Sequence, residues 1–564
     1  MKITKFFTVF ILILILTCSF FVFSACDDGS DVSVKGAVYE ENFTPTKDKA
    51  MILIPGLMAS ALFNAETDEA IWSPKGFLNL VGEFDDNLSA LDAKYEGNTY
   101  NNSEYNEEKN SLLQNLLIKY MGCDDEGVPN TTVRVANMSS ENPADAFGGM
   151  SYLYEDLYSK YRNQYDIVVW QYDWRQSNVE SARHLEDFIE KCGWNKVQFY
   201  THSMGGIVVS NYLKEASNRD KVELFMPFGA PLLGSMDAVT NLFSEDALAF
   251  VKDLFKGMGI NFNLAEVARL IPSVYELLPT KEFFALYSEG DSPIFINGAP
   301  ATYQQFMQNL LSQTWVKGSD GEIKDFIKNL ESYQDAFFVN ATYDKAKDIW
   351  VEDSKSEQKV HVSQLVSTEY VIGVGKFTVN RSHLIGDDNI TEDYADQDKT
   401  EINAAGSIFS NYIGVEGGQG NGRVSIIDYE TGIFRGLGDG TVPAYSASCG
   451  QSLDSANCHL VYGVKHGPLL NDSIDSVNGY CPAYLTGLAY IDEVLPDYVA
   501  KTDAEIVLAD VNGSGRPSDI NAVSEDIKIT AITVGSVLTV AAAVIVLTYI
   551  LTKNKTRKKA VKED

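Results

Sequence analysis

A serine stands between an apolar strand and an apolar helix in this sequence. The segment Thr201-His202-Ser203-Met204-Gly205-Gly206 follows a strand predicted over 196–200 and precedes a helix predicted over 205–216. A serine on such a turn is exposed above the edge of a sheet, and a small residue at 205 lets the helix pack closely beneath it. The helix N-terminus adds partial positive charge. The segment therefore favours a nucleophile over the alternative, an ordinary polar loop, although Thr201 replaces the usual glycine.

A serine nucleophile needs a base, and the base needs an orienting acid. In a chain that follows this strand–turn–helix plan, the order is serine, acid, histidine. His466, in Lys465-His466-Gly467-Pro468, comes just after a strand predicted over 459–464, which is where the base is expected. His459 begins that strand and is the weaker candidate because it lies at the opposite end. The histidines after Ser203 are His361, His383, His459 and His466.

The acid is best placed at Asp439, in Gly438-Asp439-Gly440-Thr441-Val442-Pro443. The flanking glycines allow a sharp turn that aims the carboxylate at an imidazole. Asp-Gly pairs are also ordinary turn residues. The position of Asp439 between Ser203 and His466 favours the catalytic interpretation.

Acyl transfer also needs donors for the developing oxyanion. The backbone N–H of Met204, directly after the nucleophile, is one candidate. The other is the N–H of Leu57 in Pro55-Gly56-Leu57, which follows a strand predicted over 51–54. A plain turn explains Pro-Gly equally well.

Strands and helices alternate around these residues, which predicts an α/β protein with a mostly parallel sheet. Strands are expected over 166–171, 196–200 and 222–228, and a helix follows Ser177 and ends before Gly193. We expect a core in two parts, 49–235 and 366–500, with an insertion at 58–145 that is exposed over 84–110. A mainly helical cap over 236–365 separates the two parts. Later core elements are expected at 370–375, 423–427, 459–464 and, as a helix, 484–495.

The two ends of the chain predict export and anchoring. Residues 1–26 combine a basic start, an apolar stretch and small residues before a cut site, as in a secretory signal. Cys26 also stands where a bacterial lipoprotein signal has its lipidated cysteine; an ordinary cleaved signal and an uncleaved anchor are the alternatives. Residues 529–551 carry no charge and, at about 1.5 Å per residue, span the roughly 30 Å hydrocarbon core. The basic tail at 552–564 marks the cytoplasmic side.

This pattern predicts a single-pass C-terminal transmembrane helix in the cell membrane, with the catalytic part extracytoplasmic. The polar segments 27–48 and 501–528 are then a leader and a stalk.

Charge and motifs argue against several classes of function. The formal net charge of −33 repels phosphate backbones, so no nucleic-acid partner is expected. The chain has no HExxH or GxxxxGK[ST] motif, no GxGxxG at a strand-to-helix junction and no Cys/His spacing typical of zinc, so neither metal nor cofactor is expected. Export permits disulfides, and Cys449 and Cys458 are near enough in sequence to close a short loop, although the pairing is not fixed. The oligomeric state is open.

Five segments, in order, resemble the lecithin:cholesterol acyltransferase family, which includes lysosomal phospholipase A2-like enzymes. Pro272-Ser273 with Leu277-Leu278-Pro279 also resembles a stretch of that family's cap, and the resemblance spans roughly 50–495. It implies an α/β-hydrolase fold with a helical cap or lid. The segments are Ile54-Pro55-Gly56-Leu57, Tyr172-Asp173-Trp174-Arg175, Thr201–Gly206, Gly229-Ala230-Pro231 with Gly234-Ser235, and Gly438–Pro443 with His466.

The resemblance implies attack on a lipid ester and transfer of the acyl group to water or to an alcohol. Ser203, Asp439 and His466 then form the triad, Leu57 and Met204 supply the oxyanion donors, and residues 172–175 are structural or line the site. The apolar segment 247–278 favours an acyl chain, although burial of the cap against the core would give the same composition. Residues 58–145 do not reproduce the family's membrane-binding and lid segments, so the lipid and the acceptor stay open. The alternatives are a serine hydrolase of another class, such as a peptidase or an esterase on non-lipid esters, and a non-catalytic surface-binding module on the same fold.

Overall fold

The computed structural model of the chain describes the parts that position the candidate residues. These are residues 32–34, 37–40, 43–72, 83–84, 87–95, 102–124, 127–136, 150–243, 264–287, 292–317, 322–346, 349–374, 378, 382–385, 423–426, 438–453, 455–462 and 466–470.

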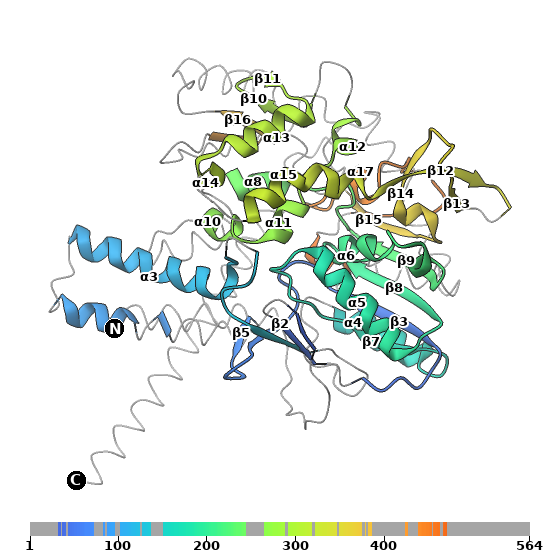
Figure 1. The fold of residues 1–564 in the computed structure, drawn as a ribbon, viewed down its shortest axis with the longest axis horizontal. Helices are drawn as coiled ribbons and strands as arrows, with labels where there is room; N and C mark the ends of the chain where they lie inside the picture. Colours follow the sequence, from blue (N-terminus) through green and yellow to red (C-terminus); the bar gives the residue numbers. More distant parts are fainter. Residues whose placement is uncertain are drawn as a thin grey trace, which may run out of the picture.

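A six-stranded sheet forms the centre of the molecule, and every neighbouring pair of its strands is parallel (Figure 1). In order across the sheet the strands are β18 (Cys458–Tyr462), β15 (Tyr370–Val374), β9 (Val222–Phe228), β8 (Lys196–His202), β3 (Lys49–Ile54) and β7 (Asp166–Val169). The chain runs from β3 to β7 at one edge and then returns to the other side of β3 to form β8. The strand order therefore reverses between β3 and β8, which is where open α/β sheets bind ligands at their carboxyl ends.

Both faces of the central sheet are buried, as the alternation of strands and helices in the sequence predicts. Ile52, Val168 and Phe199 pack on one face with α5 (Asn178–Cys192) and α6 (Gly205–Tyr212). Their neighbours Met51 and Ile167 point to the other face, against α4 (Met150–Tyr161). Complete burial of one such side chain contributes about 1.5–3 kcal/mol. The alternation fixes which face each strand residue occupies, and so fixes the register of the sheet.

The helix that precedes β8 begins and ends as its sequence predicts. The side chain of Ser177 accepts a hydrogen bond from the backbone N–H of Val179 at the start of α5. Gly193 ends the helix in the left-handed conformation, with a φ of 69°, and donates to the carbonyl groups of Ile189 and Glu190. The short α7 (Ala216–Arg219) then leads into β9.

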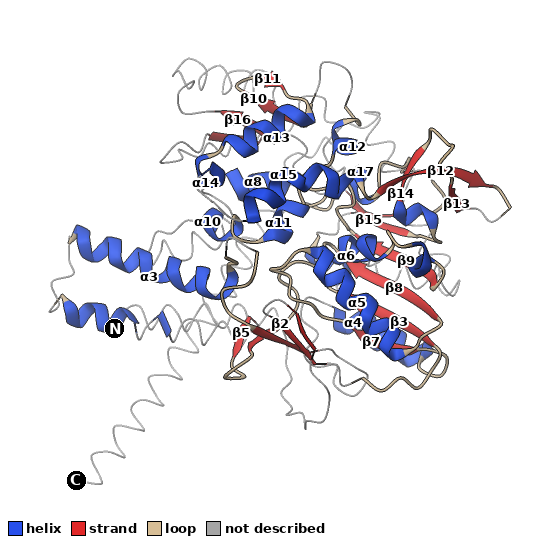
Figure 2. Ribbon diagram, in the orientation of Figure 1, coloured by secondary structure: helices blue, strands red, loops and turns tan. Residues whose placement is uncertain are grey.

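The cap lies over one side of the sheet and mixes helices with strands (Figure 2). The sequence predicts a mainly helical cap over 236–365, so the strands of two small sheets were not expected in it. Residues 382–385 and 423–426, which complete the second of these sheets, come from the part that was expected to belong to the core. The helices are α8 (Met236–Phe243), α10 (Leu264–Ala268), α11 (Pro272–Glu276), α12 (Lys281–Phe284), α13 (Tyr303–Ser312), α14 (Thr314–Lys317) and α15 (Glu322–Asp335). One sheet contains β13 (Ile349–Glu352), β12 (Phe338–Asp344) and β14 (Lys359–His361), and the other contains β11 (Ala299–Pro300), β10 (Ile294–Ile296), β16 (Ser382–Ile385) and β17 (Arg423–Ile426).

The prediction that residues 423–427 form a strand of the core sheet is wrong. As β17 it pairs antiparallel with β16 in the second small sheet, not with the central strands. Short apolar runs form strands in either setting, and their composition does not name the pairing partner. The expected core strands at 370–375 and 459–464 do lie in the central sheet, as β15 and β18.

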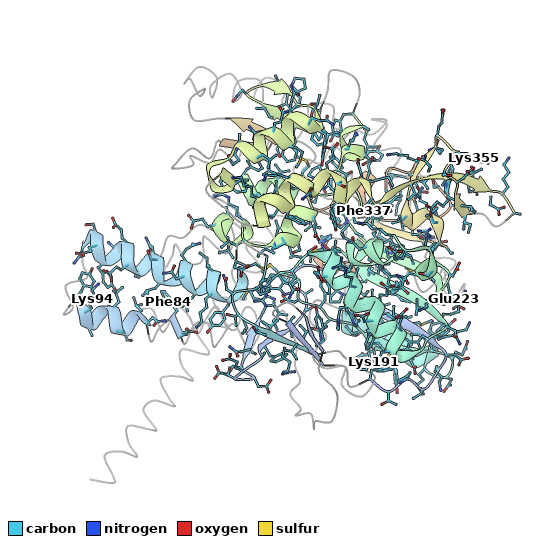
Figure 3. All side chains as sticks on the ribbon, viewed as in Figure 1. Phe84, Lys94, Lys191, Glu223, Phe337 and Lys355 are labelled. Carbon is cyan, nitrogen blue, oxygen red and sulfur yellow. The ribbon has the colours of Figure 1, made fainter. Side chains whose placement is uncertain are left out.

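Residues 84–110 were expected to be exposed, but the described residues of this segment lie mostly in helices with buried side chains. The long helix α3 (Ser103–Met121) projects from the body of the molecule, and a second helical segment covers 87–94 (Figure 1). Phe84, whose position Figure 3 labels, is buried together with Leu91 and Tyr105. Tyr105 also donates from its hydroxyl to Asp92 at 2.6 Å. The polar residues of this segment therefore cover an apolar seam.

Strands on both sides of β3 in the sequence form a small five-stranded sheet. Its strands, in order, are β1 (Val32–Val34), β2 (Ala37–Glu40), β6 (Val133–Ala136), β4 (Leu62–Asn64) and β5 (Ala70–Trp72). Three short elements complete the described fold: η3 (Val362–Leu365), α17 (Ala444–Ala447) and η5 (Gly467–Leu470).

Among the described helices, none has both the length and the hydrophobicity that crossing a bilayer requires. The expected signal at 1–26, helix at 484–495, stalk at 501–528, transmembrane helix at 529–551 and basic tail at 552–564 lie outside the described residues.

Candidate active site

Ser203 stands on a strained turn between β8 and α6. Its φ of 54° is in the left-handed region that residues with a Cβ rarely adopt. The next helix can start here because Gly205 and Gly206 leave no side chain in the way. A Cβ on Gly205 would lie 2.5 Å from the carbonyl oxygen of Ile54, and one on Gly206 would lie 2.4 Å from Cβ of Ala230. The turn thus holds Ser203 above the carboxyl end of β8.

The strain at Ser203 predicts a difference in stability between two variants that both lack the hydroxyl group. Ser203→Gly relieves the positive φ, whereas Ser203→Ala keeps it. We expect the glycine variant to have a free energy of unfolding about 1 kcal/mol greater than that of the alanine variant. Urea unfolding of the two full-length proteins measures this difference. Equal or lower stability of the glycine variant would show that the turn carries no strain.

His466 lies between Ser203 and Asp439 and forms hydrogen bonds with both. The Ser203 hydroxyl donates to Nε2 of His466 over 2.9 Å, and Nδ1 of His466 donates to Oδ2 of Asp439 over 2.7 Å. Ser203 thus joins His466, which lies 263 positions further along the chain, and Asp439 in one continuous series of hydrogen bonds at the carboxyl edge of the sheet. The backbone N–H of His466 also donates to the carbonyl of Asp439 at 2.8 Å, which fixes the two loops to each other.

Asp439 is held by its own loop. Its side chain is 1% exposed, and Oδ1 accepts the backbone N–H groups of Thr441 at 3.0 Å and Val442 at 2.8 Å. Gly440 has a φ of 96°, which lets the chain turn sharply enough for these two bonds. The second carboxylate oxygen, Oδ2, is left to face His466.

Two opposing effects set the pKa of His466. Burial alone would lower it, because the charged imidazolium loses its hydration. The charge of Asp439 and the hydrogen bond to it outweigh burial, and Asp237 adds to them, so the pKa is raised above the ordinary value of 6.5. Asp237 lies in the first turn of α8, and burial raises its own pKa to about 7.

Gly229 supports the histidine–carboxylate pair from below. It follows β9 with a φ of 57°. A Cβ at this position would lie 2.8 Å from Oδ2 of Asp439 and 3.2 Å from Nδ1 of His466. Any side chain here would push the two groups apart, which is the physical reason for glycine in Gly229-Ala230-Pro231.

The predicted oxyanion donors lie next to Ser203. A Cβ on Gly56 would be only 2.7 Å from Cβ of Ser203 and 3.3 Å from its Oγ, so the loop that carries Leu57 is packed against the hydroxyl. Met204 begins the turn into α6. Within the described part of the chain, the backbone N–H groups of Leu57 and Met204 have no hydrogen-bond acceptor. Two donors beside a serine hydroxyl can receive a developing negative charge.

Residues 172–175 are structural supports of the site. The hydroxyl of Tyr172 donates to the carbonyl of Pro55 at 3.0 Å and so holds the loop that carries Leu57. Asp173 and Arg175 form a fully buried ion pair at 2.7 Å. Arg175 also donates to the carbonyl groups of Tyr120 and Thr131 at the base of α3 and before β6. The segment therefore ties the insertion to the core.

The cap is fastened to the core beside the site. The hydroxyl of Ser235 donates to the carbonyl of Thr441 in the Asp439 loop, and its N–H donates to the carbonyl of Leu277 in the cap. The carboxylate of Glu276 accepts hydrogen bonds from the Ser177 hydroxyl and from the backbone N–H of Asn178, at the start of α5. Burial raises the pKa of Glu276 to about 7.

The other histidines after Ser203 lie elsewhere. His459 is at the amino end of its strand, as predicted, and pairs with Glu369 at 2.8 Å. His361 is buried and contacts the Ser363 hydroxyl at 2.8 Å. His383 lies in β16 of the second small sheet.

Among the described residues, no group of three His, Cys, Asp or Glu side chains is arranged to hold a metal ion. Cys449 and Cys458 are not joined, so the suggested loop-closing disulfide is not formed.

A family model described as lecithin:cholesterol acyltransferase matches residues 153–382, which include Ser203 but end before Asp439 and His466. No curated protein sequence matches the chain. Among solved structures, a chain of "The crystal structure of Tle4-Tli4 complex" is similar, with 15% identity and a TM-score of 0.44 over 81% of this chain and 99% of that chain. Over residues 153–382 the chain is therefore similar to the lecithin:cholesterol acyltransferase family, in agreement with the resemblance of its motifs.

Proposed function

We propose that this chain is a serine-dependent acyl hydrolase or O-acyltransferase that acts on lipid esters through an acyl-enzyme on Ser203. The observation that carries the proposal is the hydrogen-bonded chain from Ser203 Oγ to His466 Nε2, at 2.9 Å, and from His466 Nδ1 to Asp439 Oδ2, at 2.7 Å. The family match supports a lipid ester as the substrate class. No cofactor is needed for this chemistry.

In the first half-reaction, Oγ of Ser203 attacks the ester carbonyl carbon while Nε2 of His466 takes its proton. The carbonyl oxygen becomes negatively charged and accepts hydrogen bonds from the N–H groups of Leu57 and Met204. Each donor of this kind contributes about 3 kcal/mol in the transition state. Asp439 stays ionised and stabilises the imidazolium. The bond to the leaving alcohol then breaks, and His466 gives that oxygen its proton.

In the second half-reaction, the acyl group leaves Ser203. His466 takes a proton from water or from an acceptor alcohol, whose oxygen attacks the acyl carbon. The bond to Oγ breaks, and His466 returns a proton to Ser203. Water yields a fatty acid, and an alcohol yields a new ester. The same residues serve both outcomes, so the acceptor decides between hydrolase and transferase.

The proposed setting is an α/β-hydrolase domain with a cap, exported and held at the cell membrane by a C-terminal helix. The support for export and anchoring is the apolar and basic composition of residues 1–26 and 529–564. An anchor of this kind would keep the site near its lipid substrate.

Product analysis tests the proposal. The full-length chain is incubated in detergent with a phospholipid labelled in its acyl chain, with and without a long-chain alcohol. We expect labelled fatty acid without the alcohol and, for a transferase, labelled ester with it. Ser203→Ala serves as the control and should form neither. An inert phospholipid together with rapid cleavage of short non-lipid esters would instead support an esterase of another class, and no turnover of either would support a binding module.

A further inference from the structure

His202, the residue before the serine, contacts the loop that carries the proposed base. Its Nε2 lies 2.9 Å from the backbone carbonyl oxygen of His466. The two imidazole rings lie with their centroids 4.8 Å apart and their planes tilted by 35°. His202 is 7% exposed, so water competes little for this contact. A residue at the end of β8 thus reaches across to a loop that follows β18.

This contact differs from the other hydrogen bonds of His466. The bond between its Nε2 and the Ser203 hydroxyl must break and form again in each turnover, and Nδ1 is engaged by Asp439. The contact from His202 ties the same histidine to the strand that carries the nucleophile, and it involves no atom that exchanges a proton with substrate. The carbonyl of His466 also accepts a longer bond, of 3.3 Å, from the N–H of Leu469 within its own loop.

The protonation state of His202 suits a permanent donor. A carbonyl oxygen is an acceptor, so Nε2 of His202 must carry a hydrogen. Burial, and then the neighbouring His466, lower the pKa of His202 to about 4, although its bond to the carbonyl and the charge of Asp439 oppose this. The ring is therefore neutral near pH 7. Its neutral state places no second positive charge beside the imidazolium that forms on His466.

We propose that His202 is a positioning residue that holds His466 within reach of Ser203 through its Nε2–H donor. The inference rests on the proposed function of this site. It predicts that the location of the donor atom at position 202 matters more than its aromatic character.

Three substitutions separate these properties. Gln places an amide N–H near the position of Nε2, Asn places one near the position of Nδ1, and Leu has neither. We expect kcat on a short p-nitrophenyl ester to fall about tenfold or more in His202→Asn and His202→Leu, with little change in KM, because a small displacement of the base costs rate and not binding. His202→Gln should recover most of the wild-type kcat.

The pH dependence of kcat/KM gives a second measurement, because its midpoint does not change when part of the protein is unfolded. In the Asn and Leu variants His466 interacts less closely with Asp439, so the acid limb of kcat/KM should shift to lower pH. A smaller folded fraction would lower the whole profile and leave its midpoint in place. Thermal unfolding of each variant checks the fold, and if the Leu variant is unfolded, the comparison of Gln with Asn decides.

The two hypotheses fail in different ways. Absence of Ser203-dependent turnover in the wild type would remove the proposed function itself. Wild-type turnover that is unchanged in rate and pH profile by Asn or Leu would overturn the role of His202 and leave the proposed function standing. Equal losses in the Gln, Asn and Leu variants, with unchanged melting temperatures, would also overturn it.

Discussion

Ser203→Ala is expected to lower kcat on lipid and p-nitrophenyl esters by about a millionfold, the loss that is typical when a triad nucleophile is removed. The variant lacks the oxygen that forms the acyl-enzyme, while His466, Asp439 and the N–H groups of Leu57 and Met204 remain. Substrate binding should change little because the missing atom contacts substrate chiefly in the reaction. Residual turnover should match the background that water and the oxyanion donors support.

A fluorophosphonate probe measures the same loss independently of substrate choice, since it labels an activated serine covalently. The wild type should be labelled and Ser203→Ala should not. Ser210→Ala is the matched control: Ser210 lies in α6, seven positions along the chain, and its hydroxyl donates to the carbonyl of Gly206 at 2.7 Å. If Ser203→Ala keeps full labelling or turnover while Ser210→Ala loses it, Ser203 is not the nucleophile.

The central part of the fold could be predicted because its signals are local. The strands β7, β8 and β9 are rich in apolar and aromatic residues, and α5 is bounded by Ser177 and Gly193, whose roles depend only on neighbouring backbone groups. Parallel strands place their carboxyl ends at one edge. For that reason Ser203, Asp439 and His466 could be expected to meet although they are far apart in sequence.

The cap and the early insertion could not be predicted in the same way. Apart from β12, the strands of the two small cap sheets are short, and some are defined by a partner that lies far away in the chain, such as β10 with β16. The sequence of α3 is rich in Asn and Glu, and only a narrow row of its residues is apolar. This composition is typical of an exposed insertion, which is what was predicted. Pairing of this kind depends on tertiary contacts that composition does not contain.

The supporting residues of the site carried weaker signals than the reacting ones. Tyr172 was expected to be structural or to line the site, but its bond to Pro55 is a contact between two separate motifs. Gly229 stood in a recognised motif, although nothing local showed that it lies under Asp439 and His466. The sequence did not show a role for His202. A histidine before the serine can donate a hydrogen bond to any nearby acceptor, and the sequence does not say that this acceptor is the carbonyl of His466.

Asp439→Asn is expected to lower kcat by about ten-thousandfold, as when the acid of such a triad becomes an amide. The amide oxygen replaces Oδ1 as the acceptor of the Thr441 and Val442 N–H groups, so the amide NH2 faces Nδ1 of His466. That nitrogen must then accept a hydrogen, and the ring carries its own hydrogen on Nε2. A ring protonated on Nε2 cannot take the proton of Ser203, and the negative charge that stabilised the imidazolium is gone.

The pH dependence gives this prediction its second test. His466 must be neutral to act as a base, so activity rises with pH through its pKa, which in the wild type is raised above 6.5 by Asp439 against the effect of burial. Without that carboxylate, burial dominates, and the acid limb of kcat/KM should move to lower pH while the plateau falls. Glu369→Gln is the matched control, because Glu369 pairs with His459 at 2.8 Å in another buried carboxylate–histidine contact, at the amino end of the same sheet. The control should keep wild-type turnover. If Glu369→Gln loses as much turnover as Asp439→Asn, any buried pair of this kind supports the fold, and Asp439 has no special part in the chemistry.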